Sequence, residues 1–296
     1  MNTRNLGARE RVKDPRDKLL GAVQAPVAIP ATFVPDLSWF KRNFQGATAY
    51  CGVHSGTHFQ AILQHQTTPE NSQQFSPRYG EIKLKTPTSP VYDGFPISEG
   101  TTLTAIFKWL QKLGADSYEP LENDVLLPVE TYCDPSAVTP EMDVDAANNK
   151  IQTYAFDALT FEALQQAIYQ NKAVILLIKC DNGFWGTINP TFTTPTDGHF
   201  VVAYGYDETG IWVVDSAEPN NEFAFKHISS QYITPEFFFE SGTAVDPQTV
   251  VAAVAPIVQE AAAIVPEIES APATPAQKET LTEEVEDIVE IIEEIL

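Results

Sequence analysis

Residues 45–59 read QGATAYCGVHSGTHF and contain Cys51, one of three cysteines in the 296-residue chain. The cysteine stands in a run of small residues, which let a backbone or a substrate approach closely. A helix is predicted from about Tyr50 to about Gln64, because its apolar residues give a partly buried pattern. Taken alone, Cys51 is typical of a small buried residue, since free cysteines are often buried. Other parts of the chain decide between that interpretation and a nucleophile.

Three further polar residues stand where a cysteine nucleophile needs support. His199 heads a predicted strand, Asp215 ends the next strand of the same hairpin, and Gln45 precedes Cys51 by six residues. A thiolate is favoured at a helix N-terminus beside a histidine, an acceptor orients that histidine, and an N–H group faces the developing oxyanion. We therefore predict Cys51 as the nucleophile and His199 as its base. Asp215 is predicted to orient the imidazole, and Gln45 to donate to the oxyanion.

This pattern resembles that of the papain-like cysteine peptidases, class C1, over about residues 25–243. The family's Gln, followed six positions later by its Cys at the start of a long central helix, matches Gln45 and Cys51. The family's His, followed by apolar residues and Gly-Tyr, matches His199 in GHFVVAYGY, and its orienting Asn falls sixteen positions later, at Asp215. The resemblance implies peptide-bond hydrolysis by a Cys-His-Asp triad on a two-lobe fold.

The chain departs from the family pattern at several positions. Gly52 follows the cysteine where an aromatic residue is usual, and Asp215 replaces the usual Asn. The Trp that normally shields the His–Asn bond is absent from Asp215-Ser216-Ala217-Glu218, which predicts a more exposed and weaker His–Asp pair. The 24 residues ahead of the core are too few for an inhibitory pro-domain, so the activity is expected not to be held latent in this way, or to be low.

A sister class, the C39-like peptidases, shares Gln-x5-Cys-Gly and a Gly-His pair with a later Asp, so its pattern overlaps here. The predicted helix at 101–113 and the long middle segment favour class C1. Both classes stay open at the level of the residues.

The predicted fold class is α+β, a papain-like domain at 25–245 with a helical lobe at about 45–150 and a barrel-like antiparallel lobe at about 151–243. An N-terminal arm (1–24) precedes it and an acidic helical tail (246–296) follows. The stretch 115–150 is predicted to be irregular. The elements expected elsewhere are a helix over Thr101–Leu113 stopped by Gly114, a helix over Thr160–Gln170 capped by Thr160, and strands over 151–156, 173–180, 199–206, 210–215, 223–228 and 232–239.

Charge and composition restrict the partners. The net charge of −22 and a pI near 4.4 argue against nucleic-acid binding, which needs clustered Lys and Arg. The N-terminus has no apolar core typical of a signal peptide, and the longest apolar run, 250–265, is shorter than a membrane span. Three widely spaced cysteines favour a reducing compartment. The expected location is cytoplasmic, or virion-associated if the source is viral.

The tail residues 279–296 read ETLTEEVEDIVEIIEEIL. Its apolar positions alternate at spacings of four and three, the seam of a heptad repeat: Leu281, Val285, Ile288, Ile292 and Ile295. A lone helix of this length is marginal in water, and its like charges repel. The tail is therefore predicted to dock on a protein partner or to self-associate; a disordered acidic tail is the alternative.

Metal and cofactor chemistry is not predicted. Cys51, His54 and His58 share one helical face as C-x2-H-x3-H, which is a metal-site spacing, but no second cluster supplies the remaining ligand. Histidines on a central helix are more often satisfied in the core. Cys180 is expected to serve packing, and Cys133 has no evident role.

Three functions are compatible with these residues. The first is a cysteine peptidase acting on peptide or protein substrates. The second is a weak or inactive papain-like module held in a larger assembly such as a virion. The third is an amidase or endopeptidase directed at peptidoglycan. The complete set of Gln45, Cys51, His199 and Asp215 favours the first or the third, whereas the missing Trp and pro-domain favour the second.

Overall fold

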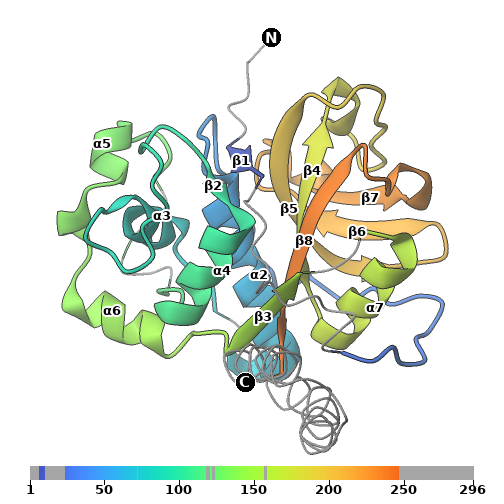
Figure 1. Cartoon of the computed structure of the whole chain (residues 1–296), viewed down its shortest axis with the longest axis horizontal. Helices are drawn as coiled ribbons and strands as arrows, with labels where there is room; N and C mark the ends of the chain where they lie inside the picture. Colours follow the sequence, from blue (N-terminus) through green and yellow to red (C-terminus); the bar gives the residue numbers. More distant parts are fainter. Residues whose placement is uncertain are drawn as a thin grey trace, which may run out of the picture.

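The computed structural model describes residues 7–10, 24–71, 73–117, 121, 124–156 and 159–246. Within them the chain forms two lobes, one of helices and one built on an antiparallel sheet, with the long helix α2 between them (Figure 1). The predicted α+β two-lobe architecture is therefore confirmed. In these ranges no helix combines the length and apolar character that crossing a membrane requires. The predicted tail helix lies outside the described residues.

Helix α2 (Cys51–Thr67) is the central element and packs against elements of both lobes. All of its residues from 51 to 62 are buried. A Cβ at Gly52 would lie 2.4 Å from Thr101 Cγ2, and one at Gly56 would lie 2.8 Å from the Trp109 ring. Close packing therefore requires the small residues around Cys51.

The described part of the helical lobe also holds α3 (Pro77–Lys85), α4 (Leu103–Lys112), α5 (Val129–Tyr132) and α6 (Pro140–Ala147). Helix α4 starts two residues later than predicted, because the Thr102 side chain caps it by accepting a hydrogen bond from Ala105 N. Gly114, just beyond its end, has a φ of 85° and is the predicted stop. The prediction that 115–150 is irregular is wrong, since α5 and α6 lie there. Thr139 followed by Pro140 is a helix-start signal that could have located α6.

The second lobe is a six-stranded sheet in the order β3-β8-β4-β5-β6-β7, with every neighbouring pair antiparallel. The strands are β3 (Thr153–Phe156), β4 (Val174–Cys180), β5 (Asp197–Tyr206), β6 (Gly210–Val214), β7 (Phe225–Ser229) and β8 (Phe238–Val245). Helix α7 (Phe161–Asn171) packs on the sheet and is capped by the predicted Thr160. Figure 1 shows β6 and β7 turned steeply against β4 and β8, as the barrel-like prediction requires.

Strand β4 explains why its sequence reads as an almost continuous apolar run. Ile175 and Leu177 belong to the core shared with α2, whereas Val174 and Leu176 belong to the core shared with α7. Successive side chains of a strand point to opposite faces, and both faces of this strand are covered. The α2-facing side of the sheet thereby carries the core that joins the two lobes.

The last predicted strand, 232–239, is wrong at its start. Residues Ser230–Tyr232 form a 3₁₀ turn, and the backbone N–H groups of Phe237 and Phe238 both donate to Thr234 O in a further turn. Pro235 lies in this turn and has no N–H to contribute to a ladder. The strand therefore begins only at Phe238.

Candidate active site

Cys51 is the first residue of α2 and has no exposed surface. Its position at a helix N-terminus places the thiol where the helix dipole favours a negative charge. The backbone around it is held by the preceding loop, in which Thr48 Oγ1 donates to Gln45 O at 2.7 Å. The predicted nucleophile thus lies at the start of the central helix, as predicted.

His199 and Asp215 meet across the hairpin of β5 and β6. His199 Nε2 lies 2.8 Å from Asp215 Oδ1, and both side chains are fully buried. Asp215 Oδ1 also accepts the backbone N–H of Ala217 at 2.8 Å. Burial by itself would lower the His199 pKa, but Asp215 and then Cys51 raise it to about 9. At neutral pH the imidazole is therefore protonated.

The Cys51 thiol interacts with the His199 imidazole. This interaction contributes to the raised pKa of His199, after the contribution of Asp215. Because Asp215 takes Nε2, Nδ1 is the nitrogen available to the thiol, and within the described ranges Nδ1 has no hydrogen-bond partner. Hydrogen bonds between a nucleophile and its base are often long or absent before a substrate binds.

Gln45 lies on the loop before α2, and two bonds tie it to the residue after Asp215. Its backbone N–H donates to Ser216 O at 2.9 Å, and its side-chain Oε1 accepts from Ser216 Oγ at 2.7 Å. Its Nε2 donates to Thr48 O at 2.9 Å. Since an amide nitrogen carries two N–H groups, the second is available to a ligand. The structure therefore brings Cys51, His199 and Asp215 together, with Gln45 connected to them through Ser216.

The His199–Asp215 pair is shielded from water, which corrects the expectation of an exposed pair. The Trp185 ring centroid lies 5.6 Å from that of His199, and the Phe184 centroid lies 6.1 Å away. These rings come from the segment between β4 and β5, not from the residues after Asp215 where the family's Trp is found. Sequence reasoning missed them because they are fourteen or more positions before the histidine. The shield is thus present but has a different origin in the chain.

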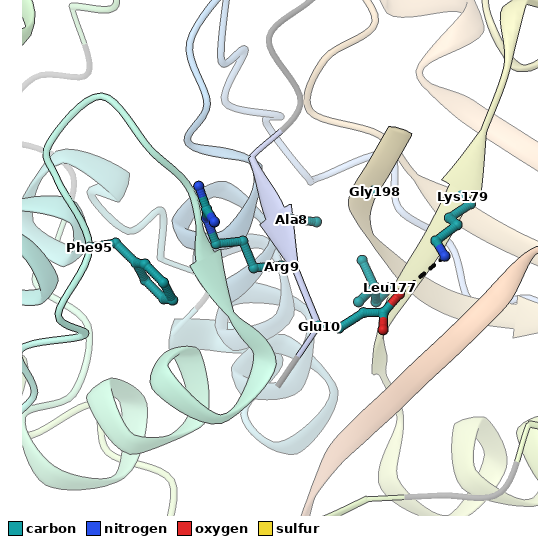
Figure 2. Close-up of a pocket in the computed structure, with 7 residues that line it drawn as sticks. All are labelled: Ala8, Arg9, Glu10, Phe95, Leu177, Lys179 and Gly198. Atoms are coloured by element: carbon teal, nitrogen blue, oxygen red, sulfur yellow. Dashed lines mark ion pairs between the residues drawn. The ribbon is translucent and has the colours of Figure 1, made fainter. Parts of the chain in front are cut away.

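Residues 7–10 of the N-terminal arm cross the cleft between the lobes, and we call them the strap (Figure 2). Within it, β1 (Ala8–Arg9) pairs in parallel with β2 (Thr101–Thr102), and Thr101 N donates to Gly7 O at 3.0 Å. A Cβ at Gly7 would lie 1.7 Å from Ala49 O, two residues before Cys51. The arm, predicted to be too short for a pro-domain, therefore supplies a segment that covers the site.

Charged side chains fasten the strap to both lobes. Arg9 pairs with Glu99 beside β2 and lies over the Phe95 ring, on the helical side. Glu10 Oε1 lies 3.1 Å from Lys179 Nζ on β4 (Figure 2). A hollow of about 370 Å³ beside the strap is lined by residues of both lobes and by the strap itself. The strap thus bridges the cleft next to the site.

The remaining cysteines and helix histidines lie in the packed interior. Burial raises the Cys133 pKa to about 11, and its sulfur lies 3.7 Å from the Tyr50 hydroxyl. Burial also raises the Cys180 pKa. His54 Nδ1 lies 3.3 Å from Asn43 O, and His58 Nε2 accepts from Asn43 N at 3.0 Å. Burial lowers the pKa of both histidines, so they are neutral core residues, and within the described ranges no group of three or more acidic, His or Cys side chains is arranged to hold a metal.

Solved structures share this arrangement of lobes. Xylellain, a cysteine protease from Xylella fastidiosa, matches with a TM-score of 0.63 at 18% identity, over 81% of this chain and 95% of that one. The proCathepsin B S9 from Trypanosoma congolense matches with a TM-score of 0.54 at 10% identity, over 81% and 86%. The domain has the papain-like fold. The Carica candamarcensis cysteine protease CMS1MS2 in complex with E-64 matches with a TM-score of 0.54 at 14% identity, over 74% and 99%.

Sequence comparison gives a narrower match. The profile described as Peptidase_C39 like family matches residues 128–234, less than half of the chain. That segment contains His199 and Asp215 but not Cys51. No curated protein sequence matches the chain. The C39-like match thus covers most of the sheet lobe of the papain-like fold, including the His199–Asp215 pair.

Proposed function

We propose that the chain is a papain-like cysteine peptidase that hydrolyses peptide bonds through Cys51, His199 and Asp215. The observation that carries this proposal is the buried His199–Asp215 bond of 2.8 Å, next to a thiol at the start of α2. A protonated imidazole with a pKa of about 9 stabilises an adjacent thiolate. The pair therefore supplies both a nucleophile and a proton donor at neutral pH.

The reaction follows from these groups. The Cys51 thiolate attacks the carbonyl carbon of the scissile amide, and the electron pair of the C=O bond moves onto the oxygen. The Gln45 side-chain N–H and the backbone N–H of Cys51 donate to this oxyanion. The His199 imidazolium then gives its proton to the leaving amine as the C–N bond breaks. Water, deprotonated by the neutral His199, attacks the thioester, releasing the acid and restoring the thiolate–imidazolium pair.

A peptide substrate fits the cleft because an extended piece of the chain already occupies it. The strap forms a backbone pair with β2, and its Gly7 carbonyl lies close to Gly100, where a Cβ would stand 1.3 Å from that oxygen. On the opposite wall, a Cβ at Gly198 would lie 2.8 Å from Ala8 O of the strap. Both walls thus accept a bare backbone at close approach, as an extended peptide requires. The same occupancy makes this form latent until the strap leaves.

The tail keeps its predicted role as a proposal. We infer that residues 246–296 dock on a protein partner or on a second copy and are dispensable for the site. The helix α4 at the predicted position favours class C1, whereas the family profile that matches is the C39-like one. Deleting the tail is expected to leave Cys51 reactivity intact and to change only association, measured by light scattering and thiol labelling together.

Turnover of a fluorogenic peptide library by the full chain tests the function. The Gly7→Val variant, whose added side chain cannot coexist with Ala49 O, provides an open cleft. In that background Cys51→Ser is expected to lower turnover at least about 1,000-fold, because nucleophile and base act as a unit. Cys133→Ser is the matched control, since that thiol is also buried but contacts Tyr50, and it should change turnover less than about twofold. Turnover that survives Cys51→Ser would overturn the proposal.

A further inference from the structure

The carboxylate of Asp215 has two differently occupied oxygens. Oδ1 accepts from both His199 Nε2 and Ala217 N. Oδ2 is buried and accepts no hydrogen bond from the part of the chain that the structure describes. The Lys226 ammonium lies 3.8 Å from Oδ2 and is itself completely buried. A buried carboxylate is thus paired with a buried cation on the side away from the histidine.

Lys226 comes from β7, where it is paired with Val213 of β6. Its Nζ lies 3.3 Å from Glu218 Oε2 and donates to Thr187 O at 3.2 Å. It also lies 4.8 Å above the Phe184 ring. A buried Lys at an inward-facing strand position is costly unless it is paired, and here it has two carboxylates and a carbonyl. Burying the Lys226 ammonium beside the Asp215 carboxylate is energetically unfavourable without these partners, which suggests that the lysine has a role at this site.

The same cluster fixes the segment that shields the histidine. Glu218 Oε2 accepts the backbone N–H of Gly186 at 2.8 Å, and Lys226 holds the carbonyl of Thr187. These two residues directly follow Phe184 and Trp185, whose rings lie against His199. The Lys226 ammonium therefore lies beside the Asp215 carboxylate and also binds the end of the segment whose aromatic rings shield His199.

We propose that Lys226, held by Glu218, is a positioning residue that offsets the charge of Asp215 and fixes the imidazole and its aromatic shield. The inference rests on the proposed function only for its catalytic readout. An aspartate in place of the usual asparagine adds a buried negative charge that favours imidazolium. The Lys226 ammonium counters that effect at close range. The substitution at 215 is thereby balanced by a cation supplied from another strand.

Other charged and titratable groups also surround Asp215. Arg42 donates to the backbone carbonyls of Asp215 and Ser216 at 3.1 and 3.2 Å, so it adds a positive charge on the loop side. The Cys180 and Cys51 thiols also face this region. Burial alone would raise the Asp215 pKa, but His199 and then Lys226 lower it below its ordinary value. Lys226 is the cation that faces the carboxylate itself.

The test uses full-length variants and two readouts. Lys226→Met removes the cation and Glu218→Gln removes its other carboxylate, while Lys226→Arg keeps the charge. The pKa of His199 is measured by NMR with labelled imidazoles, which needs no turnover, and the alkaline limb of kcat/KM is measured in the Gly7→Val background. Lys85→Met is the matched control, because Lys85 is an equally buried lysine paired with Asp93.

We expect Lys226→Met to raise the His199 pKa by about one unit, as loss of a nearby cation at an effective dielectric of about 20 implies. Glu218→Gln should lower it, because Lys226 then acts on Asp215 unopposed, and Lys226→Arg should leave it near the native value. Lys85→Met should lower the melting temperature without moving the His199 pKa. Equal pKa values in native, Lys226→Met and Glu218→Gln proteins would overturn the inference. Absent turnover in every protein, with the NMR shifts present, would overturn the proposed function alone.

Discussion

Replacing Asp215 by Asn tests what sets the protonation of His199. Two buried histidines in the chain provide the comparison. His199, with the carboxylate at 2.8 Å, has a pKa raised to about 9, whereas burial lowers the pKa of His54, which contacts the backbone of Asn43, to about 3. The difference between them shows that the Asp215 charge outweighs burial at His199. Removing that charge should let burial lower the His199 pKa.

The magnitude follows from the separation of the charges. Opposite charges centred about 4 Å apart interact by about 4 kcal/mol at an effective dielectric of about 20, which is about 3 pKa units. The His199 pKa is therefore expected to fall from about 9 to about 6 in Asp215→Asn. At pH 7.5 roughly 3% of the variant would retain the imidazolium, so kcat/KM should fall roughly 30-fold.

The assay is the pH dependence of kcat/KM for peptide hydrolysis in the Gly7→Val background, where the alkaline limb reports loss of the imidazolium proton. The imidazolium is present below the His199 pKa and lost above it, so a lower pKa moves the alkaline limb to lower pH. Asp207→Asn is the matched control, since Asp207 pairs with His227 at the hairpin turn, away from Cys51. An alkaline limb that stays near pH 9 in Asp215→Asn would refute the reasoning.

Three further outcomes are expected. Gly7→Val should expel the strap and raise the rate of Cys51 labelling by a peptide probe at least about tenfold, because its Cβ would lie 1.7 Å from Ala49 O; unchanged labelling would show that the strap does not block the cleft. Trp185→Ala should admit water to the His199–Asp215 pair and move the alkaline limb of kcat/KM down by about half a unit, and an unmoved limb would argue against shielding. Burial raises the Glu81 pKa to about 8, so the stability it contributes is present below pH 4.5 and lost as pH rises through about 8. Glu81→Gln should therefore flatten the decline in urea unfolding free energy between pH 5 and 8.5, by roughly 4 kcal/mol, and a decline identical to native would contradict this.

The sequence predicted the fold where local patterns and tertiary packing agree. The run at 173–180 is apolar throughout because both faces of β4 are covered, and this made it recognisable. Helix α4 ends where Gly114 indicated. Helix α6 was missed because its amphipathic pattern is weak and only two of its residues, Met142 and Ala146, are buried.

The part of the site that follows from spacing along the chain was predictable. Cys51, His199 and Asp215 follow the family spacing, and the structure brings them together. The shield of His199 and the cation beside Asp215 were not predictable, because their positions depend on how separate strands and loops pack. Lys226 does leave a trace, since it stands at an inward position of a strand in which Ile228 is also buried. The strap is held by pairing between residues about 90 positions apart in the sequence. The periodicity of apolar residues carries no information about such long-range pairing.

The most direct test of the central claim is to identify which cysteine reacts. The native chain, Gly7→Val and Gly7→Val/His199→Ala are treated at pH 7 with a peptide carrying an epoxide or fluoromethyl ketone, and the labelled peptides are mapped by mass spectrometry. Because the proposed mechanism pairs His199 with the Cys51 thiol, we expect label on Cys51 alone, faster in Gly7→Val and abolished without His199. Label on Cys133 or Cys180, or labelling of Cys51 that persists in the His199→Ala variant at the same rate, would contradict it.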